Sequence, residues 1–193
     1  MQYKVIDQFC GHADILFQHC LKGWLWEYCP TKTNRSENKF NYQMFHNLFS
    51  PKIYFPSQRP LAMGYPRERG YSKMWSDIDP IVDAIDKHTE VATFRRVKAN
   101  LQLVQPERVF SDFHQDYHNG EGTADTNMWV GLYYLNTNDG YTEFEDGTIV
   151  NSVADRMVFF NNEYKHRGVS QLDKKERLVI NFNFYCPIWT NPV

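Results

Sequence analysis

The amino-acid sequence predicts a mainly β protein with flanking helices (α+β), in which a sandwich or jelly roll forms the core. Three observations support this fold class. From about residue 91 onward, short strand-like runs follow one another closely, separated by turn signals. Aromatic residues make up 16% of the chain, and their flat rings pack well on pleated sheets. Helical periodicity is confined to the first half, which suits helices that cover the outside of one sheet.

The first half of the chain predicts two helices and irregular structure between them. Apolar residues recur at helical spacing over residues 12–28, and a polar, aperiodic stretch at 30–39 predicts a loop. Four prolines within residues 40–75 favour irregular structure with short strands. A second helix is expected from Ser76, as its cap, to Lys87.

The second half predicts a series of strands. Asp139-Gly140 and Asp146-Gly147 mark turns between them. The expected strands cover residues 94–103, 128–135, 142–144, 148–150, 157–160, 165–169 and 177–185. In the last strand, one face is apolar and suited to packing on helices: Leu178, Ile180, Phe182 and Phe184. The opposite face carries Arg177, Val179, Asn181, Asn183 and Tyr185. Because a buried charge and two amides need partners, this face predicts a polar pocket inside the roll.

Length and composition narrow the class of protein. At 193 residues we expect a single domain, with residues 1–90 as a helical and irregular support region and residues 91–190 as a β core that holds the functional site. The net charge of −2 gives no general attraction to nucleic acid or anionic membranes. No signal peptide or membrane span is evident, and the four cysteines form no CxxC, so we expect free thiols and a cytoplasmic location.

Four residues stand out as a candidate site. His114 and Asp116 form a His-x-Asp pair, and on a strand residues two apart point to the same face. A second histidine, His166, follows 52 residues later in a strand-like run. Two neutral imidazoles and one carboxylate on one face of a metal favour non-haem Fe(II) with open positions for a co-substrate and O₂. Arg177, at the start of the last strand, is suited to bind an acid group of that co-substrate.

These residues, together with two neighbouring motifs, resemble a known enzyme family. The chain is similar to the 2-oxoglutarate- and Fe(II)-dependent oxygenases, specifically the prolyl-4-hydroxylase-like branch, and looks most like small members encoded by bacterial viruses. The resemblance covers about residues 94–186, and the matching segments follow the family's order. They are His114-Gln115-Asp116, Leu132-Tyr133-Tyr134-Leu135-Asn136, Gly140-Tyr141-Thr142-Glu143-Phe144, His166 and Arg177.

The resemblance implies a double-stranded β-helix, a variant of the jelly roll. It implies that His114, Asp116 and His166 bind Fe(II), and that 2-oxoglutarate chelates this metal with its keto and C1 carboxylate oxygens. The far carboxylate would lie against Arg177, helped by Tyr134, because a guanidinium matches a carboxylate bidentately. Two amides would also line this pocket: Asn181 and Asn100.

The same resemblance implies the reaction. O₂ and 2-oxoglutarate would be consumed, succinate and CO₂ released, and a C–H bond of the substrate hydroxylated, with ascorbate as a further cofactor. A peptidyl or free amino acid, such as proline, is the leading substrate, followed by a nucleobase or another small metabolite. If the chain is virus-encoded, its location is the host cytoplasm.

Some positions depart from the family pattern and affect the expected substrate pocket. The usual glycine pair before the Thr-x-Phe segment is Asp139-Gly140 here, and Gln105 stands where related prolyl hydroxylases have a co-substrate-binding tyrosine. Asn183 replaces an inward tryptophan on the last strand. The metal and co-substrate residues survive these changes, whereas the substrate pocket is expected to be more polar.

Several alternatives remain open from the sequence alone. His118 shares the strand parity of His114 and Asp116 and is an alternative ligand, and a non-catalytic jelly-roll binding module is an alternative function. The polar loop at 31–39 and the segment at 63–75 are candidates for a mobile cover. Residues 65–75 mix cations with aromatics, which suits either an anionic partner such as nucleic acid or rings packed onto the protein.

Overall fold

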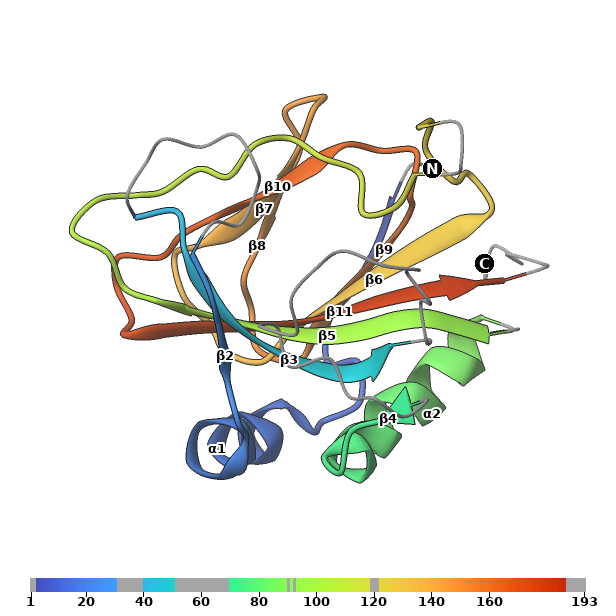
Figure 1. The fold of residues 1–193 in the computed structure, drawn as a ribbon, viewed down its shortest axis with the longest axis horizontal. Helices are drawn as coiled ribbons and strands as arrows, with labels where there is room; N and C mark the ends of the chain where they lie inside the picture. The colour runs from blue at the N-terminus through green and yellow to red at the C-terminus, as the bar shows by residue number, and fades with distance from the viewer. Residues whose placement is uncertain are drawn as a thin grey trace, which may run out of the picture.

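The computed structural model describes residues 3–30, 40–50, 70–89, 91, 93–118 and 122–186. These residues form two α-helices, one 3-10 helix and eleven strands (Figure 1). The helices are α1 (Ala13–Gly23), η1 (Trp75–Ile78) and α2 (Asp79–His88). The strands of the first half are β1 (Tyr3–Ile6), β2 (Glu27–Cys29), β3 (Gln43–Ser50) and β4 (Gly70–Tyr71). Those of the second half are β5 (Thr93–Leu103), β6 (Met128–Tyr134), β7 (Tyr141–Phe144), β8 (Ile149–Asn151), β9 (Arg156–Asn161), β10 (His166–Val169) and β11 (Glu176–Tyr185).

Two antiparallel sheets form the body of the molecule, as the sequence predicts. The large sheet has the strand order β1-β9-β6-β11-β5-β3-β2, with β4 paired to β3, and the small sheet has the order β10-β7-β8. The chain crosses from one sheet to the other after β6, so the turn at Asp139-Gly140 joins the two sheets. The turn at Asp146-Gly147 closes the β7–β8 hairpin, where the Phe144 carbonyl accepts a hydrogen bond from the Gly147 amide. Figure 1 shows the small sheet above the large one.

The helices cover the outer face of the large sheet, which confirms the predicted arrangement (Figure 1). Leu178, Ile180, Phe182 and Phe184 of β11 are fully buried in one apolar cluster with residues of both helices. Because successive side chains of a strand alternate between faces, the intervening residues of β11 point to the other side, between the sheets. A second apolar cluster lies there: Val130, Leu132, Tyr134, Phe144, Val150, Val158, Phe160 and Val179.

Several sequence expectations for the first half need correction. The first helix ends at Gly23, and β2 replaces the last part of the expected 12–28 helix. The residue before α2 is Ile78, with no side-chain cap, so Ser76 lies in the 3-10 turn instead of capping the helix. β1 was not expected; it pairs with β9, a contact that short-range periodicity cannot reveal.

The remaining sequence expectations concern the cysteines, the aromatic residues near position 70, the candidate covers and membrane-spanning helices. None of the four cysteines, all of which the structure describes, forms a disulfide bond. The rings of Tyr71 and Trp75 pack together at 4.5 Å between centroids, and Phe49 lies 5.0 Å from Tyr71, so these aromatics pack on the protein. The candidate covers at 31–39 and 63–69 lie outside the described residues. In the described part of the chain, neither α-helix has the length and apolar character needed to cross a bilayer.

Candidate metal centre and co-substrate pocket

The backbone brings His114 and His166 together across the edge of the small sheet. The amide of each histidine donates to the carbonyl of the other, both at 3.0 Å, and their ring centroids lie 4.7 Å apart. The expectation that His114 and Asp116 lie on a strand is only partly right, because this segment makes an isolated bridge to β10. That bridge is sufficient to fix the spacing of the two imidazoles.

Asp116 completes the group because its carboxylate is held on one side. Its Oδ2 accepts hydrogen bonds from the side-chain amides of Asn181 at 2.8 Å and Asn183 at 2.7 Å. The Asp116 backbone amide donates to Asn162 at 3.0 Å. The remaining oxygen, Oδ1, faces His114 Nε2 at 3.8 Å. One ligand atom each from His114, Asp116 and His166 lies within 4.8 Å of the others, and among the described residues these three form the group that could hold a metal ion.

The electrostatics keep these side chains in the protonation states that a metal requires. Burial opposes ionisation of Asp116, but Arg96 at 3.5 Å and the two histidines hold the pKa of its carboxyl well below the ordinary value. Burial lowers the pKa of His166 to about 4, so its imidazole is neutral at neutral pH. His114 donates from Nδ1 to the carbonyl of Asp112 at 3.0 Å, which leaves Nε2 unprotonated in the neutral ring.

This donor set fits Fe(II). Two imidazole nitrogens and one carboxylate oxygen on one side form the facial arrangement that non-haem iron uses. The two amides hold Oδ2, and Oδ1, which faces His114 and Arg96, is the oxygen placed to act as a ligand. His118 is not part of this group: its backbone pairs with that of Ala124 in an isolated bridge.

The three residues open into a cavity of about 230 Å³ between the sheets. The cavity is lined largely by polar side chains, and it contains both amides expected there, Asn100 and Asn181. The buried Oδ1 atoms of both amides and the Nε2 of Gln102 have no hydrogen-bond partner among the described residues, so polar atoms are available for a ligand. The other lining residues are Gln43, Arg96, Lys98, Ser111, His114, Asp116, Leu132, Thr142, His166, Gly168, Arg177 and Val179.

Arg177 lines the same cavity and is only 8% exposed. Its Nε donates to Ser152 at 2.9 Å, and its guanidinium carbon lies 5.7 Å from the ring centroid of Tyr134. Among the described residues, no carboxylate forms an ion pair with it. Burial lowers the pKa of Arg177, and a buried cation of this kind is stabilised by an acidic ligand.

Tyr134 is not among the residues that line the cavity, but its ring lies beside Arg177, which does line it. It is fully buried, its hydroxyl donates to Thr142 at 2.8 Å, and its ring packs beside Arg177. Gln105, which occupies the family's tyrosine position, is buried outside the cavity and donates to the Leu103 carbonyl at 3.2 Å.

Residues missed in the sequence include Arg96, Lys98 and Gln102, all on β5. Their signal was present, because the even positions of β5 from 96 to 102 are polar whereas Val97, Ala99 and Leu101 are buried in the apolar cluster. Ser152 and Asn162 carried no such signal, since they lie in connections whose course depends on the whole fold.

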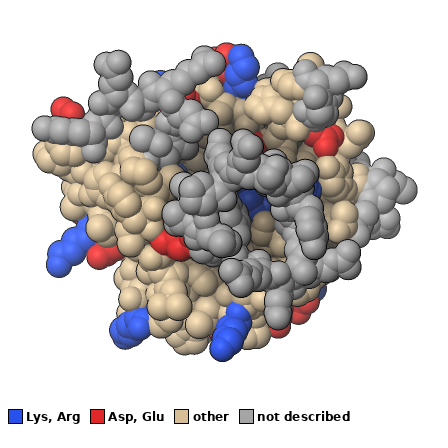
Figure 2. Space-filling view, in the orientation of Figure 1, with Lys and Arg blue, Asp and Glu red and all other residues tan. Residues whose placement is uncertain are grey.

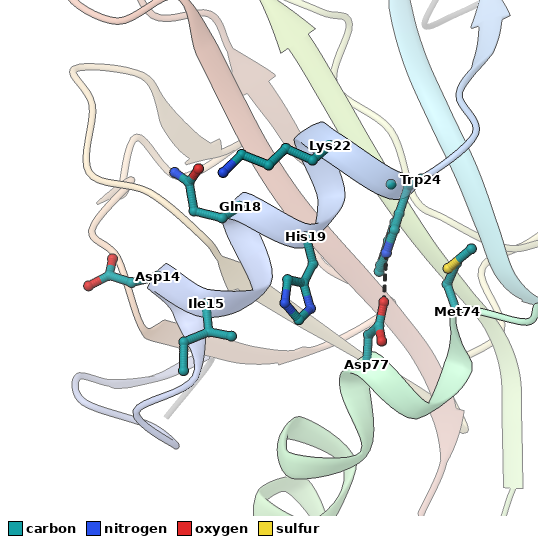
Figure 3. Close-up of a pocket in the computed structure, with 9 residues that line it drawn as sticks. Asp14, Ile15, Gln18, His19, Lys22, Trp24, Met74 and Asp77 are labelled. Atoms are coloured by element: carbon teal, nitrogen blue, oxygen red, sulfur yellow. Dashed lines mark hydrogen bonds between the residues drawn. The ribbon is translucent and has the colours of Figure 1, made fainter.

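A second and larger cavity, of about 690 Å³, lies between α1 and η1 (Figure 3). Figure 3 shows Trp24 and Asp77 at its side, joined by a hydrogen bond of 2.8 Å from the indole nitrogen. It does not contain the three ligand candidates or Arg177, so it has no part in the metal centre.

Comparison with solved structures defines the class of this fold. The chain shares the fold of the 2-oxoglutarate–Fe(II) oxygenases, whose jelly roll matches the predicted double-stranded β-helix. One match is the viral collagen prolyl hydroxylase of Paramecium bursaria Chlorella virus-1, solved as a 2-oxoglutarate complex, with a TM-score of 0.59, 15% identity and 97% of each chain covered. A prolyl-4-hydroxylase of Pseudomonas putida matches with a TM-score of 0.55 and 16% identity over 95% of this chain and 92% of that one.

A third match is the prolyl hydroxylase of Trichoplax adhaerens, solved with a peptide fragment of the hypoxia inducible factor oxygen degradation domain. It has a TM-score of 0.59 and 12% identity over 95% of this chain and 83% of that one. Comparisons with protein-family models and with curated protein sequences found no match.

The two amides on Asp116 predict a measurable effect on metal affinity. Asn183→Ala removes one donor to Oδ2 and the acceptor for Arg96 Nε, which donates to Asn183 at 3.0 Å. Because such outer contacts orient the ligand, we expect Fe(II) affinity to fall about 10- to 100-fold in an anaerobic titration. Asn151→Ala, on an exposed position of β8, is the control and leaves affinity unchanged. Unchanged affinity in the Asn183 variant would show that Asp116 needs no such support.

Gly140 sets the position of Arg177 by close approach. A Cβ at this residue would lie 2.8 Å from Arg177 Cδ and 2.9 Å from the Val169 carbonyl oxygen. We expect Gly140→Ala to lower the free energy of unfolding by about 1–3 kcal/mol and to raise the KM for 2-oxoglutarate, because the backbone atom cannot yield easily. Urea unfolding and steady-state kinetics measure the two effects. Gly23→Ala, where no atom lies within 4 Å of the added Cβ, is the matched control. A Gly140 variant that behaves like this control would show that the chain tolerates the added carbon.

Proposed function

We propose that this chain is an Fe(II)- and 2-oxoglutarate-dependent dioxygenase that hydroxylates a C–H bond of a peptidyl or free amino acid, with release of succinate and CO₂. The observation that carries the proposal is the position of Arg177, buried and with no ion-pair partner among the described residues, in the same small cavity as His114, Asp116 and His166. A binding module has no need for this combination. The fold shared with oxygenases adds independent support.

In this proposal each of the site residues predicted from the sequence has a role. His114, Asp116 and His166 hold Fe(II), which when bound supplies the redox chemistry for O₂ and the chelation of the co-substrate. The guanidinium of Arg177 binds the far carboxylate of 2-oxoglutarate through two parallel hydrogen bonds. Asn181 and Asn100 offer their amide oxygens as acceptors to a water bound beside the co-substrate or to a donor group of the substrate. Tyr134 orients Arg177 by packing against it.

The neighbouring structures and the polar lining of the cavity bear on the substrate class. The Trichoplax adhaerens neighbour was solved with a peptide, and two other neighbours are prolyl hydroxylases, so an amino acid such as proline leads. A nucleobase or another small metabolite is the second candidate, favoured by the polar lining of the cavity. Ascorbate as a reductant, a viral origin and a cytoplasmic location stay predictions.

A spectroscopic experiment tests the enzyme class directly. Anaerobic addition of Fe(II) and 2-oxoglutarate to the protein should give a weak visible charge-transfer band, since the co-substrate chelates iron held by the protein. Succinate release on admission of air, screened with peptides, free amino acids and nucleosides, then identifies the substrate. Folded protein that shows neither band nor succinate would favour a non-catalytic jelly-roll module.

A further inference from the structure

Lys98 lies in the proposed active-site cavity, yet neither the metal nor the co-substrate accounts for it. It alternates along β5 with buried apolar residues and shares the cavity face with Arg96 and Asn100. On the neighbouring strands it pairs with Asn181 of β11 and Asn47 of β3. Figure 2 shows Lys or Arg atoms near the middle of this face of the molecule. Lys98 is therefore one of the residues that line the cavity.

The ammonium group of Lys98 lacks an anionic partner. Among the described residues it forms no ion pair or hydrogen bond, and its recorded neighbour is the ring of Phe45, with Nζ 5.6 Å from the centroid. Arg96, by contrast, is engaged by Asn183 and Asp116. Burial and the charge of Arg96 lower the pKa of Lys98 to about 8, against the opposing attraction of the Asp116 carboxylate, so most molecules still carry the charge at neutral pH. A partly buried, unpaired cation costs free energy that a bound anion would recover.

The position of Lys98 separates it from the co-substrate anchor. Arg177 pairs with Gln102, whereas Lys98 pairs with Asn181, four residues further along β11. At about 3.3 Å per residue, the two backbone positions are about 13 Å apart. With one carboxylate on Arg177 and the other end on the metal, the co-substrate would have both of its acid groups engaged. Lys98, which pairs with Asn181 on the metal side of the cavity, is then left for a different ligand.

We propose that the primary substrate is a small molecule or chain end that carries an acid group, a carboxylate or a phosphate, and that Lys98 binds this group. This inference rests on the proposed dioxygenase function and specifies its substrate. Among such substrates a free amino acid, or a peptide's C-terminal residue, fits best, because a cavity of about 230 Å³ leaves little room beside the co-substrate. The acid group paired with Lys98 would place the neighbouring C–H bonds near the metal ligands.

Matched substrate pairs test the inference. Succinate release by the Fe(II)-loaded protein is measured with free L-amino acids against their amides, dipeptides against C-terminally amidated dipeptides, and nucleoside monophosphates against nucleosides. We expect the acid member of one pair to stimulate release and its neutral partner to stimulate it at least about 10-fold less, the usual effect of one charge-assisted contact. The three pairs distinguish an amino-acid carboxylate, a peptide terminus and a phosphate as the source.

Variants of Lys98 complete the test. Lys98→Met should raise the KM for the stimulating acid at least about 10-fold, Lys98→Arg should restore part of the affinity, and both should keep the charge-transfer band with 2-oxoglutarate. Lys87→Met, which removes an exposed cation of α2, should match the wild type. Stimulation by neutral partners as strong as by acids, no stimulation by any acid, or a Lys98 effect on the KM for 2-oxoglutarate alone would overturn the inference. Absence of the band in the wild type would instead contradict the proposed function itself.

Discussion

His166→Ala is expected to abolish 2-oxoglutarate turnover, with a loss of at least about 1,000-fold, because two remaining ligands cannot hold Fe(II) against water. A metal centre contributes several kcal/mol to such a reaction, and each 1.36 kcal/mol is tenfold in rate. The measurement is succinate release at saturating Fe(II) and 2-oxoglutarate, together with the anaerobic charge-transfer band, which should be lost.

The fold must be shown to survive these changes. The His166 ring is buried and lies 4.8 Å from the Phe160 ring centroid, so its removal leaves a void that lowers stability. The side chain of His114 is 37% exposed, and His114→Ala therefore removes a ligand without emptying the core. Both variants should lose turnover, while His19→Ala on the exposed side of α1 keeps it. Turnover near the wild-type level in either ligand variant would show that the metal is held elsewhere.

Arg177→Met is expected to raise the KM for 2-oxoglutarate about 100-fold while Fe(II) affinity stays within about twofold. Two charge-assisted hydrogen bonds to one carboxylate are together worth about 3 kcal/mol, which corresponds to about two orders of magnitude. Arg177→Lys keeps the charge but loses the bidentate geometry, so an intermediate KM is expected. Steady-state kinetics at varied 2-oxoglutarate and a separate anaerobic metal titration measure the two quantities.

Thermal unfolding distinguishes this role from a structural one. Replacement of a buried, unpaired guanidinium by a similar-sized apolar side chain is often neutral or stabilising, so Arg177→Met should unfold at or above the wild-type temperature. Parallel losses of stability, metal affinity and co-substrate affinity would show that Arg177 supports the fold through its bond to Ser152.

The sequence predicted the second half of the fold well because its signals are local. Strand periodicity and the turn at Asp146-Gly147 arise within a few residues, and β5 to β11 lie where they were expected. The pairing of β1 with β9 joins segments about 150 residues apart, for which neither segment carries a signal. α1 ends at Gly23, a residue that favours helix termination, whereas the apolar periodicity over 12–28 continues past it.

The main residues of the candidate site could also be predicted from the sequence, because their residue types, spacing and strand context are visible there. His114, Asp116, His166 and Arg177 were found by spacing, and the structure places all of them around one cavity. Their supports were not found: the two amides on Asp116 and the serine under Arg177 become neighbours only when β11 lies between β5 and β6. The polar alternation of β5, which brings Lys98 into the cavity, is visible in the sequence. Only the strand order shows that the polar face of β5 lines the cavity.

The alternation of β11 makes this strand intolerant of misregistration. A slip by one position would turn the amides of Asn181 and Asn183 into the apolar layer beneath the helices and would expel Ile180 and Phe182 into the polar chamber. Both changes are unfavourable, because buried amides without hydrogen bonds and apolar side chains exposed to water each raise the free energy of the folded state. The register that buries the apolar face of β11 under the helices is therefore the same register that points its polar face into the cavity. Correct packing of the core during folding also positions the residues of the site.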